Sequence, residues 1–542
     1  MNVNYQQLRQ NFLLFLFFAV MAGTLLAPIS SDTALPWVLD YFNHLDGIIQ
    51  AKAAIAEGQF PLRVSTGDLN GWRYPLYQFY SPTSYYFAGA IYRWLTPADP
   101  FAAYKLTIWC AFVLGGIYMN KLAYWFVKSR VAALLASVVY LTAPYQILLI
   151  NHLGEFNEAI AFGILPMVLF FTLERYRYPF RNSTLLKTSI AWYLLITIHI
   201  VTFIWTSFFA GLLLLLVTLK NRRHWKNLLD VVLAYLFAVF LAMWFCAPYY
   251  VLHALFQYNP SMQAQAHPFF GNLLSPAANL FVFGNGNIPN TQLSPTAGFP
   301  IFMAVGISLW ALWNKKITFK AENYWLPFFL ILFFVAFMLA WAPLNIWSWL
   351  PSLTYVTEAS WRLVGHMVWI GAIIFAWSIH WLFQNKLDSR HVVIGILILM
   401  TAASAWFPVA ERSFVSYAGF VNKPEFLTGP EAYLVSPQKY LMKINVIDSV
   451  NMYARQPGYL DANHESMLMM NMPYMLSQSS ILSADKPHLL IQGKIPAGLE
   501  NKPIKIFINN SVVAVEKLKT DKFEWNVSLV PVKAALKKAM SI

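Results

Sequence analysis

The sequence predicts an all-α polytopic membrane protein of about 11 transmembrane helices, followed by a small antiparallel β domain outside the membrane. Hydrophobic residues make up 58% of the 542 residues and charged residues only 11%, whereas about a quarter of the residues in an ordinary soluble protein are charged. Apolar stretches divide residues 1–410, and the last part of the chain shows the alternating pattern of strands.

The apolar stretches are interpreted as membrane spans. They lie near 12–30, 103–120, 131–150, 159–173, 188–203, 204–219, 228–252, 299–313, 324–341, 362–383 and 391–410. Several are shorter than the roughly 20 residues that a spanning helix needs, so their predicted boundaries are loose. The first stretch is longer than the hydrophobic region of a typical signal peptide, which favours a membrane anchor.

The loops between the spans differ in charge. One alternate set contains Lys121, Lys128 and Arg130, then Arg175, Arg177, Arg181 and Lys187, then Lys220, Arg222, Arg223 and Lys226, then Lys315, Lys316 and Lys320, then Lys386 and Arg390. The opposite loops at 151–158, 256–298 and 342–360 contain no Lys or Arg. The positive-inside rule therefore predicts a cytoplasmic N-terminus and a C-terminal region outside. The net charge of +14 reports this topology, and no nucleic-acid-binding module is visible.

The first outer loop, residues 31–100, contains two predicted helices. Apolar residues recur at helical spacing between Phe42 and Ala56, and Gly58 supplies a stop. This pattern predicts an amphipathic helix on the membrane surface. A second short helix is expected from Tyr85 to Leu95.

Two acidic segments fall on the same predicted outer face and form the candidate site. The first contains Asp40, His44 and Asp46, and the second contains His152, Glu155 and Glu158. Ionisable groups at the ends of membrane helices are costly near lipid, so a convergent set indicates a functional site. Simpler interpretations remain open: Asp40 as a helix N-cap, Asp46 on a solvated face, Glu158 interacting with a helix dipole, and His199 as a hydrogen-bonded histidine within the bundle.

Residues 411–542 are expected to form an extracytoplasmic C-terminal domain, β-rich from about residue 485. The segments HLLIQGKI, PIKIFI, SVVAVEKL and FEWNVSL read as strands, the middle two joined through Asn509 and Asn510. In the last segment apolar and polar residues alternate, which is typical of a half-buried strand. Both a packing domain and a glycan-binding sandwich are compatible with this pattern.

The order of these elements resembles a known family. Asp40 is followed four residues later by His44, then come EGQFPLR (57–63), GWRYPLYQFYSP (71–82), APY (143–145) and an acidic segment that leads into a helix with a proline (158–166). The segment 351–366, with Trp361 and Arg362, adds an aromatic-Arg element before a late span. Together they resemble bacterial polytopic membrane proteins labelled 6-pyruvoyl-tetrahydropterin synthase-related, which in turn resemble the GT-C superfamily of membrane glycosyltransferases.

The resemblance implies an inverting glycosyltransferase of the bacterial inner membrane. Such an enzyme moves a sugar from a polyprenyl-phosphate donor to a glycan, lipid or protein acceptor of the cell envelope, on the extracytoplasmic side. A carboxylate would take the acceptor proton, and cations would stabilise the leaving phosphate. The implied catalytic residues are Asp40, His44 and Glu158, and the implied substrate-binding residues are Arg63, Arg73, Arg362, Glu155, His152 and His199.

A divalent cation, Mg²⁺ or Mn²⁺, could bind where Asp40 and Asp46 approach the second acidic segment, because hard cations take carboxylate oxygens. The chain lacks the adjacent Asp-Glu pair found in the first loop of several branches of the superfamily. The alternative function is a non-catalytic membrane component, such as a lipid-glycan translocator or an assembly partner in envelope biosynthesis. A translocator needs polar residues deep in the bundle, whereas here they gather at the helix ends.

Overall fold

The computed structural model describes the helical part of the chain and several strand segments. The described residues are 5–29, 34–36, 41–65, 76–97, 99–220, 222–255, 296–314, 325–341, 346–350, 353, 356–357, 360–382, 395, 414–416, 459–460, 468–469, 488–494, 503–508, 511–517 and 522–528. The chain divides into two compact units. The first comprises Met1–Ile48 and Tyr77–Val415, and the second comprises Ile49–Leu76 and Ser416–Ile542.

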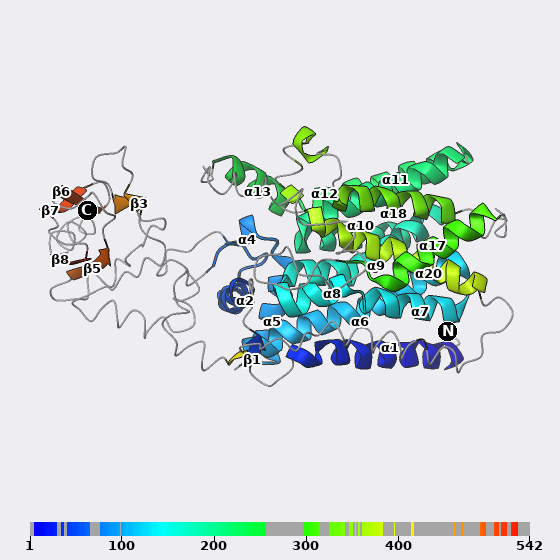
Figure 1. The fold of residues 1–542 in the computed structure, drawn as a ribbon, viewed down its shortest axis with the longest axis horizontal. Helices are drawn as coiled ribbons and strands as arrows, with labels where there is room; N and C mark the ends of the chain where they lie inside the picture. Colours follow the sequence, from blue (N-terminus) through cyan, green and yellow to red (C-terminus); the bar gives the residue numbers. More distant parts are fainter. Residues whose placement is uncertain are drawn as a thin grey trace. The chain divides into compact units, whose positions relative to one another are not determined.

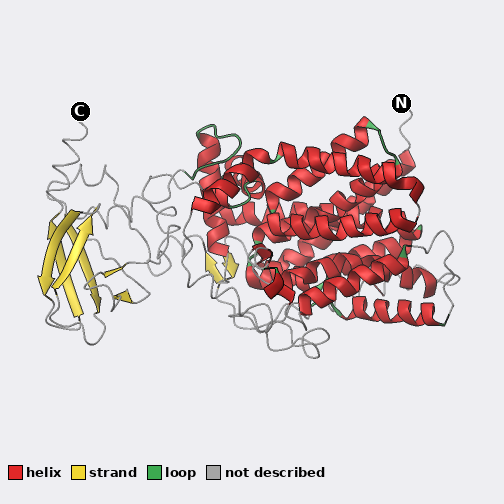
Figure 2. Cartoon of the chain, turned by 90° about the horizontal axis from the view of Figure 1, so that it is seen from above, coloured by secondary structure: helices red, strands yellow, loops and turns green. Residues whose placement is uncertain are grey.

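The first unit is a bundle of helices that run side by side (Figures 1 and 2). Its α-helices are α1 (Tyr5–Leu26), α5 (Thr83–Trp94), α6 (Pro100–Val127), α7 (Arg130–Leu141), α8 (Pro144–Leu148), α9 (Phe156–Arg177), α10 (Asn182–Ile198), α11 (Ile200–Lys220), α12 (Trp225–Leu241), α13 (Met243–Leu255), α17 (Phe299–Trp313), α18 (Leu326–Trp341) and α20 (Val364–Leu382). A π-helix (Leu149–Leu153) follows α8, and a 3₁₀ helix (Ser360–Leu363) precedes α20. Other 3₁₀ helices lie at Ala27–Ile29, Arg222–His224 and Ile346–Trp349, and a strand, β1, lies at Ala34–Pro36.

Six helical segments in the described residues are long and apolar enough to cross a membrane. They are Leu8–Leu26, Pro100–Val127, Arg130–Asn151, Phe156–Arg177, Ile200–Lys220 and Ser360–Leu382. α17 and α18 are shorter apolar helices. The structure thus supports an integral membrane protein, while the predicted number of 11 spans and the side on which each terminus lies stay predictions.

One predicted span differs from the structure. The stretch 228–252 is broken between α12 and α13, which meet at an angle of 64°. The break falls at Ala242, and Pro248 lies inside α13. The sequence pattern did not reveal the bend because the hydrophobicity continues through it. The predicted span at 391–410 lies outside the described residues except for position 395.

The helices α6 and α9 approach each other closely within the bundle. A Cβ atom built on Gly163 would lie 2.7 Å from the backbone oxygen of Ala111, and one on Gly115 would lie 2.9 Å from the backbone oxygen of Gly163. Small residues permit this approach, as they commonly do between membrane helices. This packing fixes the position of α9, whose first turn carries Glu158.

The predicted helices of the first outer loop are present. α2 (Tyr41–Ala56) begins in the first unit and ends in the second, and Gly58 beyond it has a φ of +85°. α5 matches the second predicted helix, and the short α4 (Leu76–Phe79) lies between them in sequence. The interpretation of Asp46 as part of a solvated face is wrong, because its exposed fraction is only 7%.

Four described strands of the C-terminal region, β5 to β8, lie where the sequence predicts strands. β5 (His488–Lys494) pairs antiparallel with β8 (Lys522–Ser528), and β6 (Pro503–Ile508) pairs antiparallel with β7 (Ser511–Lys517). The chain also has the short strands β2 (Phe414–Ser416), β3 (Tyr459–Leu460) and β4 (Leu468–Met469), of which β3 and β4 pair with each other. A compact, extracytoplasmic C-terminal domain remains a prediction.

Candidate functional site

The start of α9 is shaped by an irregular backbone. α8 continues into the π-helix, and Gly154 then turns the chain with a φ of +73°. The N–H of Glu155 donates to the carbonyl of Leu149 at 3.1 Å. A Cβ on Gly154 would lie 2.9 Å from the backbone nitrogen of Tyr41, so glycine is needed both for its conformation and for space. π-Helical turns inside helices occur frequently at functional sites.

Aromatic residues hold this turn in place. The hydroxyl of Tyr41 donates to the carbonyl of Ile150, and the hydroxyl of Tyr104 donates to the carbonyl of Gly154 at 3.3 Å. The ring of Phe156 stacks on that of Tyr104, with the ring centres 4.7 Å apart. The first turn of α2 is therefore anchored directly to the segment that presents the second acidic cluster.

A buried ion pair lies at the centre of the site. Arg362, in the 3₁₀ helix before α20, donates from Nη1 to Glu158 Oε2, and the Tyr145 hydroxyl donates to the other oxygen of the same carboxylate. Arg362 Nη2 also lies 3.3 Å from Glu155 Oε1. The Glu158 side chain is 1% exposed and that of Arg362 10%. Residues 204 positions apart in the sequence thus form one charged cluster.

His44 lies beside this cluster as a neutral side chain. Its Nδ1 is 2.7 Å from the hydroxyl of Tyr85, and its ring stacks on the Tyr85 ring. Burial, together with the positive charge of Arg362, lowers the pKa of His44 to about 3. The imidazole is therefore uncharged at neutral pH and can exchange hydrogen bonds, but it cannot supply positive charge.

His199 and His152 belong to the same end of the bundle. His199 ends α10, and its Nδ1 is 2.7 Å from the hydroxyl of Thr202. Its electrostatic neighbours include Arg362 and His44. His152 lies in the π-helix. Of the predicted residues, the structure therefore gathers His44, Glu155, Glu158, His199 and Arg362.

The remaining predicted residues are Asp40, Asp46, Arg63 and Arg73, of which the structure describes Asp46 and Arg63. Asp40 and Arg73 lie outside the described residues. Arg63 belongs to the second compact unit, where its backbone N–H donates to the side chain of Gln59 at 3.3 Å. Asp46 is buried in the first unit. The described residues contain no group of three or more His, Cys, Asp or Glu side chains arranged for a metal ion, and the predicted pair Asp40 and Asp46 extends beyond them.

Two residues of the cluster were not assigned a role from the sequence. Tyr145 binds the Glu158 carboxylate, and Tyr85 binds His44. Tyr145 is the last residue of the APY segment, which the sequence distinguishes only by its place in the order of motifs. Its place at the first turn of α8, directly after a proline, is the one signal that could have singled it out.

Comparison with solved structures gives a likeness of fold. No family model matches the chain, and no curated protein matches its sequence. The structure is similar to that of the archaeal oligosaccharyltransferase AglB from Archaeoglobus fulgidus, determined in complex with an inhibitory peptide and a dolichol-phosphate. The TM-score is 0.47 and the identity 14%. The match covers 78% of this chain and 59% of the AglB chain, so this chain spans less than two thirds of the length of AglB.

The TM-score of this likeness is below 0.5, and the predicted resemblance to GT-C membrane glycosyltransferases stays a prediction. At this TM-score and identity the likeness establishes neither activity nor the role of any residue. The pterin-synthase-related label and the bacterial origin gain no support from it.

Proposed function

We propose that the chain is a membrane glycosyltransferase that moves a sugar from a polyprenyl-phosphate donor to an envelope acceptor on the extracytoplasmic side. The observation that carries the proposal is the buried cluster of Arg362, Glu158, Glu155 and Tyr145 beside the neutral His44. Buried ionisable groups at the end of a membrane bundle indicate a site that handles charged or polar substrate.

The position of the cluster along α9 supports the predicted sidedness. Glu158 lies in the first turn of α9, whereas Arg175 and Arg177 lie in its last turn. A helix of 22 residues is about 33 Å long at 1.5 Å per residue, close to the roughly 30 Å of a bilayer core. The acidic and basic ends of one helix are thus separated by one membrane thickness, and the positive-inside rule puts the basic end in the cytoplasm.

The contacts suit different roles for the charged residues. Glu158 accepts hydrogen bonds from both Tyr145 and Arg362, so it is better suited to orienting Arg362 than to taking a proton. In the proposed reaction Asp40 is the general base, and neutral His44 binds the acceptor hydroxyl through hydrogen bonds. The hydroxyl oxygen forms the bond to the anomeric carbon as its proton passes to Asp40, and the lipid phosphate leaves with the electron pair of the broken bond.

Arg362 is proposed to stabilise the leaving phosphate. Its guanidinium carries two carboxylate neighbours, of which Glu155 is the more weakly held at 3.3 Å. A phosphate oxygen could replace Glu155 on Nη2 while Glu158 keeps the group oriented, because guanidinium matches two oxygens at once. A divalent cation at Asp40 and Asp46 would add further positive charge at the phosphate.

The test is transfer of radiolabelled sugar from polyprenyl-phosphate donors in membranes that contain the wild-type protein or Asp40→Asn. We expect transfer in the wild type and a loss of at least about 100-fold in the variant, the usual range for a general base. Glu57→Gln, which changes an exposed carboxylate directly after α2, is the control and should retain activity.

Two outcomes would overturn the proposal. Unchanged transfer by a well-folded Asp40→Asn variant removes Asp40 from the role of base. No transfer by the wild type with any donor favours the non-catalytic alternative, a translocator or assembly partner in which the Arg362 cluster is only structural.

A further inference from the structure

Two turns at the opposite end of the bundle have unusual backbone conformations. Lys128 follows α6 with a φ of 57°, and Phe180, between α9 and α10, has a φ of 61°. Among the residues that the structure describes, these are the two non-glycine positions with positive φ. Such a conformation costs free energy and persists only when the surroundings impose it, so it invites a functional explanation.

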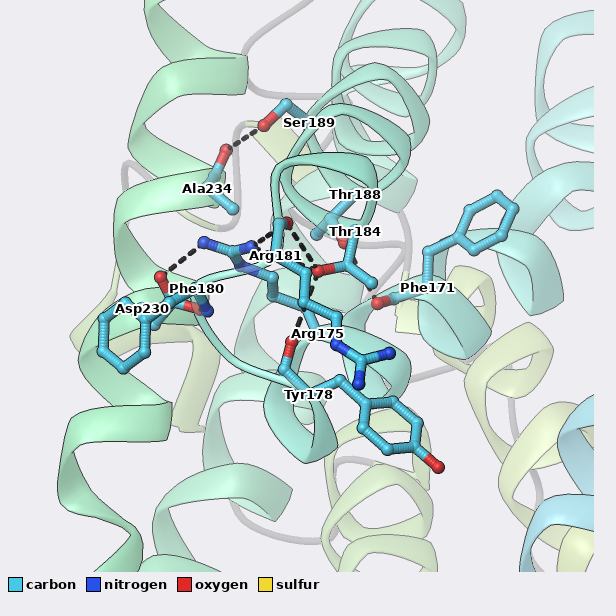
Figure 3. A network of polar contacts seen from close by, with 10 residues as sticks. All are labelled: Phe171, Arg175, Tyr178, Phe180, Arg181, Thr184, Thr188, Ser189, Asp230 and Ala234. Atoms are coloured by element: carbon cyan, nitrogen blue, oxygen red, sulfur yellow. Dashed lines mark hydrogen bonds and ion pairs between the residues drawn. The ribbon is translucent and has the colours of Figure 1, made fainter.

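A buried polar network fixes the turn that contains Phe180 (Figure 3). Arg175 Nη2 pairs with Asp230, and Arg175 Nη1 donates to the Thr184 hydroxyl at 3.1 Å and to the carbonyl of Arg181. The other carboxylate oxygen of Asp230 accepts from the backbone N–H of Phe180 at 3.0 Å. The network thus ties α9, the turn and α12 together, and it sets the direction of the side chains on the turn.

Three exposed cations share two aromatic rings beside this network. Lys128 Nζ lies 5.4 Å from the ring centre of Trp125, and Arg177 Cζ lies 5.0 Å from the same ring. Arg177 also lies 5.6 Å from the ring centre of Tyr178, and Arg181 lies 4.8 Å from it. The cations come from three helix ends, those of α6, α9 and α10. We call Lys128, Arg177 and Arg181 the basic triad.

The basic triad holds like charges close together. Within the described part of the chain, none of its members forms an ion pair, while the nearby Asp230 is occupied by Arg175. Partial burial and the charge of Arg177 lower the pKa of Lys128. A guanidinium packed on a ring through its face keeps the N–H groups along its edge available to oxygen atoms. An anion with several oxygens would relieve the repulsion.

The surroundings favour a lipid over a soluble anion. Phe180, which precedes Arg181, is 67% exposed, and Tyr124, whose ring centre lies 5.6 Å from Lys128 Nζ, is 40% exposed. Exposed aromatic side chains beside cations, at the ends of membrane helices, are typical of the level of the lipid headgroups. Anionic lipids attract basic residues next to the cytoplasmic leaflet.

We propose that the basic triad binds the phosphate headgroup of an anionic glycerophospholipid of the inner leaflet. Lys128, Arg177 and Arg181 surround the phosphate, and the exposed rings contact the glycerol and the first methylene groups. The rigid turns with positive φ hold the cations at this spacing before the lipid binds. The inference rests on the predicted sidedness and does not depend on the proposed enzymatic activity.

The test is a titration of the detergent-solubilised full-length protein with phosphatidylglycerol and, separately, phosphatidylcholine, followed by native mass spectrometry. We expect preferential binding of phosphatidylglycerol, weakened roughly tenfold or more in Lys128→Gln/Arg177→Gln. The matched control is Arg223→Gln/Lys226→Gln, which removes the same charge from exposed positions of another inner turn and should bind nearly as well as the wild type. Arg177→Lys keeps the charge but loses the planar guanidinium group. Its affinity for phosphatidylglycerol should lie between those of the two double variants.

Three results would overturn the proposal. Equal weakening in the two double variants would mean that only overall charge matters. Equal binding of the two lipids by the wild type would mean that the basic triad does not select an anionic headgroup. Glycerol 3-phosphate binding as tightly as phosphatidylglycerol would identify a soluble ligand in place of a lipid. A thermal unfolding scan of each variant separates misfolding from lost binding, and Arg177→Lys tests the site if a double variant does not fold.

Discussion

The ion pair between Glu158 and Arg362 gives the sharpest test of the site. Glu158→Gln preserves the size of the side chain and leaves an oxygen for Tyr145, but it removes the charge that faces Arg362. Both side chains are largely buried, at 1% and 10% exposed. Removing one partner of a buried pair costs about 3–5 kcal/mol, because the other charge stays buried without compensation. Arg362 keeps Glu155 at 3.3 Å, so we expect the lower end, about 3 kcal/mol.

The assay is the free energy of unfolding of the detergent-solubilised protein, measured by denaturant titration. Glu155→Gln is the matched control, since it makes the same chemical change beside the same arginine. Because the Glu155 side chain is 16% exposed and its contact is longer, its loss should cost less than about 1 kcal/mol. A double-mutant cycle of Glu158→Gln with Arg362→Gln should give a coupling energy of about 2 kcal/mol or more.

Two results would refute this reasoning. If Glu158→Gln and Glu155→Gln cost the same, the deeper burial of Glu158 gives its ion pair no special weight. If the effects of Glu158→Gln and Arg362→Gln simply add in the double variant, the two side chains do not interact energetically. Either result would also remove Glu158 from its proposed role of orienting Arg362.

Two further predictions concern the surroundings of the site. Because the pKa of His44 is lowered to about 3, the unfolded chain binds a proton that the folded chain does not, and stability is lost as pH falls from about 6.5 toward 3. Between pH 7.5 and pH 5 the unfolding free energy should fall by up to about 2 kcal/mol more in the wild type than in His44→Gln. The same pH dependence in both proteins would mean that His44 does not titrate as proposed. Gly163→Ala should destabilise the protein by about 1–3 kcal/mol through overpacking, because its Cβ would lie 2.7 Å from a backbone oxygen of α6. The control is Gly211→Ala, whose new Cβ would have no atom within 4 Å, so the change should be neutral or stabilising. Thermal unfolding midpoints of the two variants measure the difference, and similar midpoints would argue against the close approach of α6 and α9.

Hydrophobicity predicts the helices well where one apolar run corresponds to one straight helix. The boundary between 203 and 204 was expected between two spans, and the structure breaks the chain at His199, between α10 and α11. Hydrophobicity does not show where the helix axis changes direction within an apolar run, so the sequence does not predict the 64° bend after α12. The π-helix was missed for a similar reason, since a wider helical turn in an apolar run leaves the composition unchanged.

The candidate site was partly predictable because charge is rare in an apolar chain. His44, Glu155, Glu158 and Arg362 attract notice by residue type alone, and the structure places them in one cluster. Tyr145 and Tyr85 did not, because aromatic residues make up 17% of the chain and residue type alone does not distinguish these two. Their hydrogen bonds depend on the packing of α8 and α5 against the acidic segments, which spacing in the sequence does not show.

The two ends of α9 show how one helix can serve two charged environments. At its first turn, carboxylates outnumber the arginine, so Arg362, Glu155 and Glu158 together carry a formal charge of −1. At its last turn, Arg175 is balanced by Asp230, while Arg177 remains beside Lys128 and Arg181. An anionic ligand therefore has to displace a carboxylate at the first end but can bind directly at the second. If both proposals hold, binding of a lipid phosphate should depend on Glu155 at one end of α9 and be independent of it at the other.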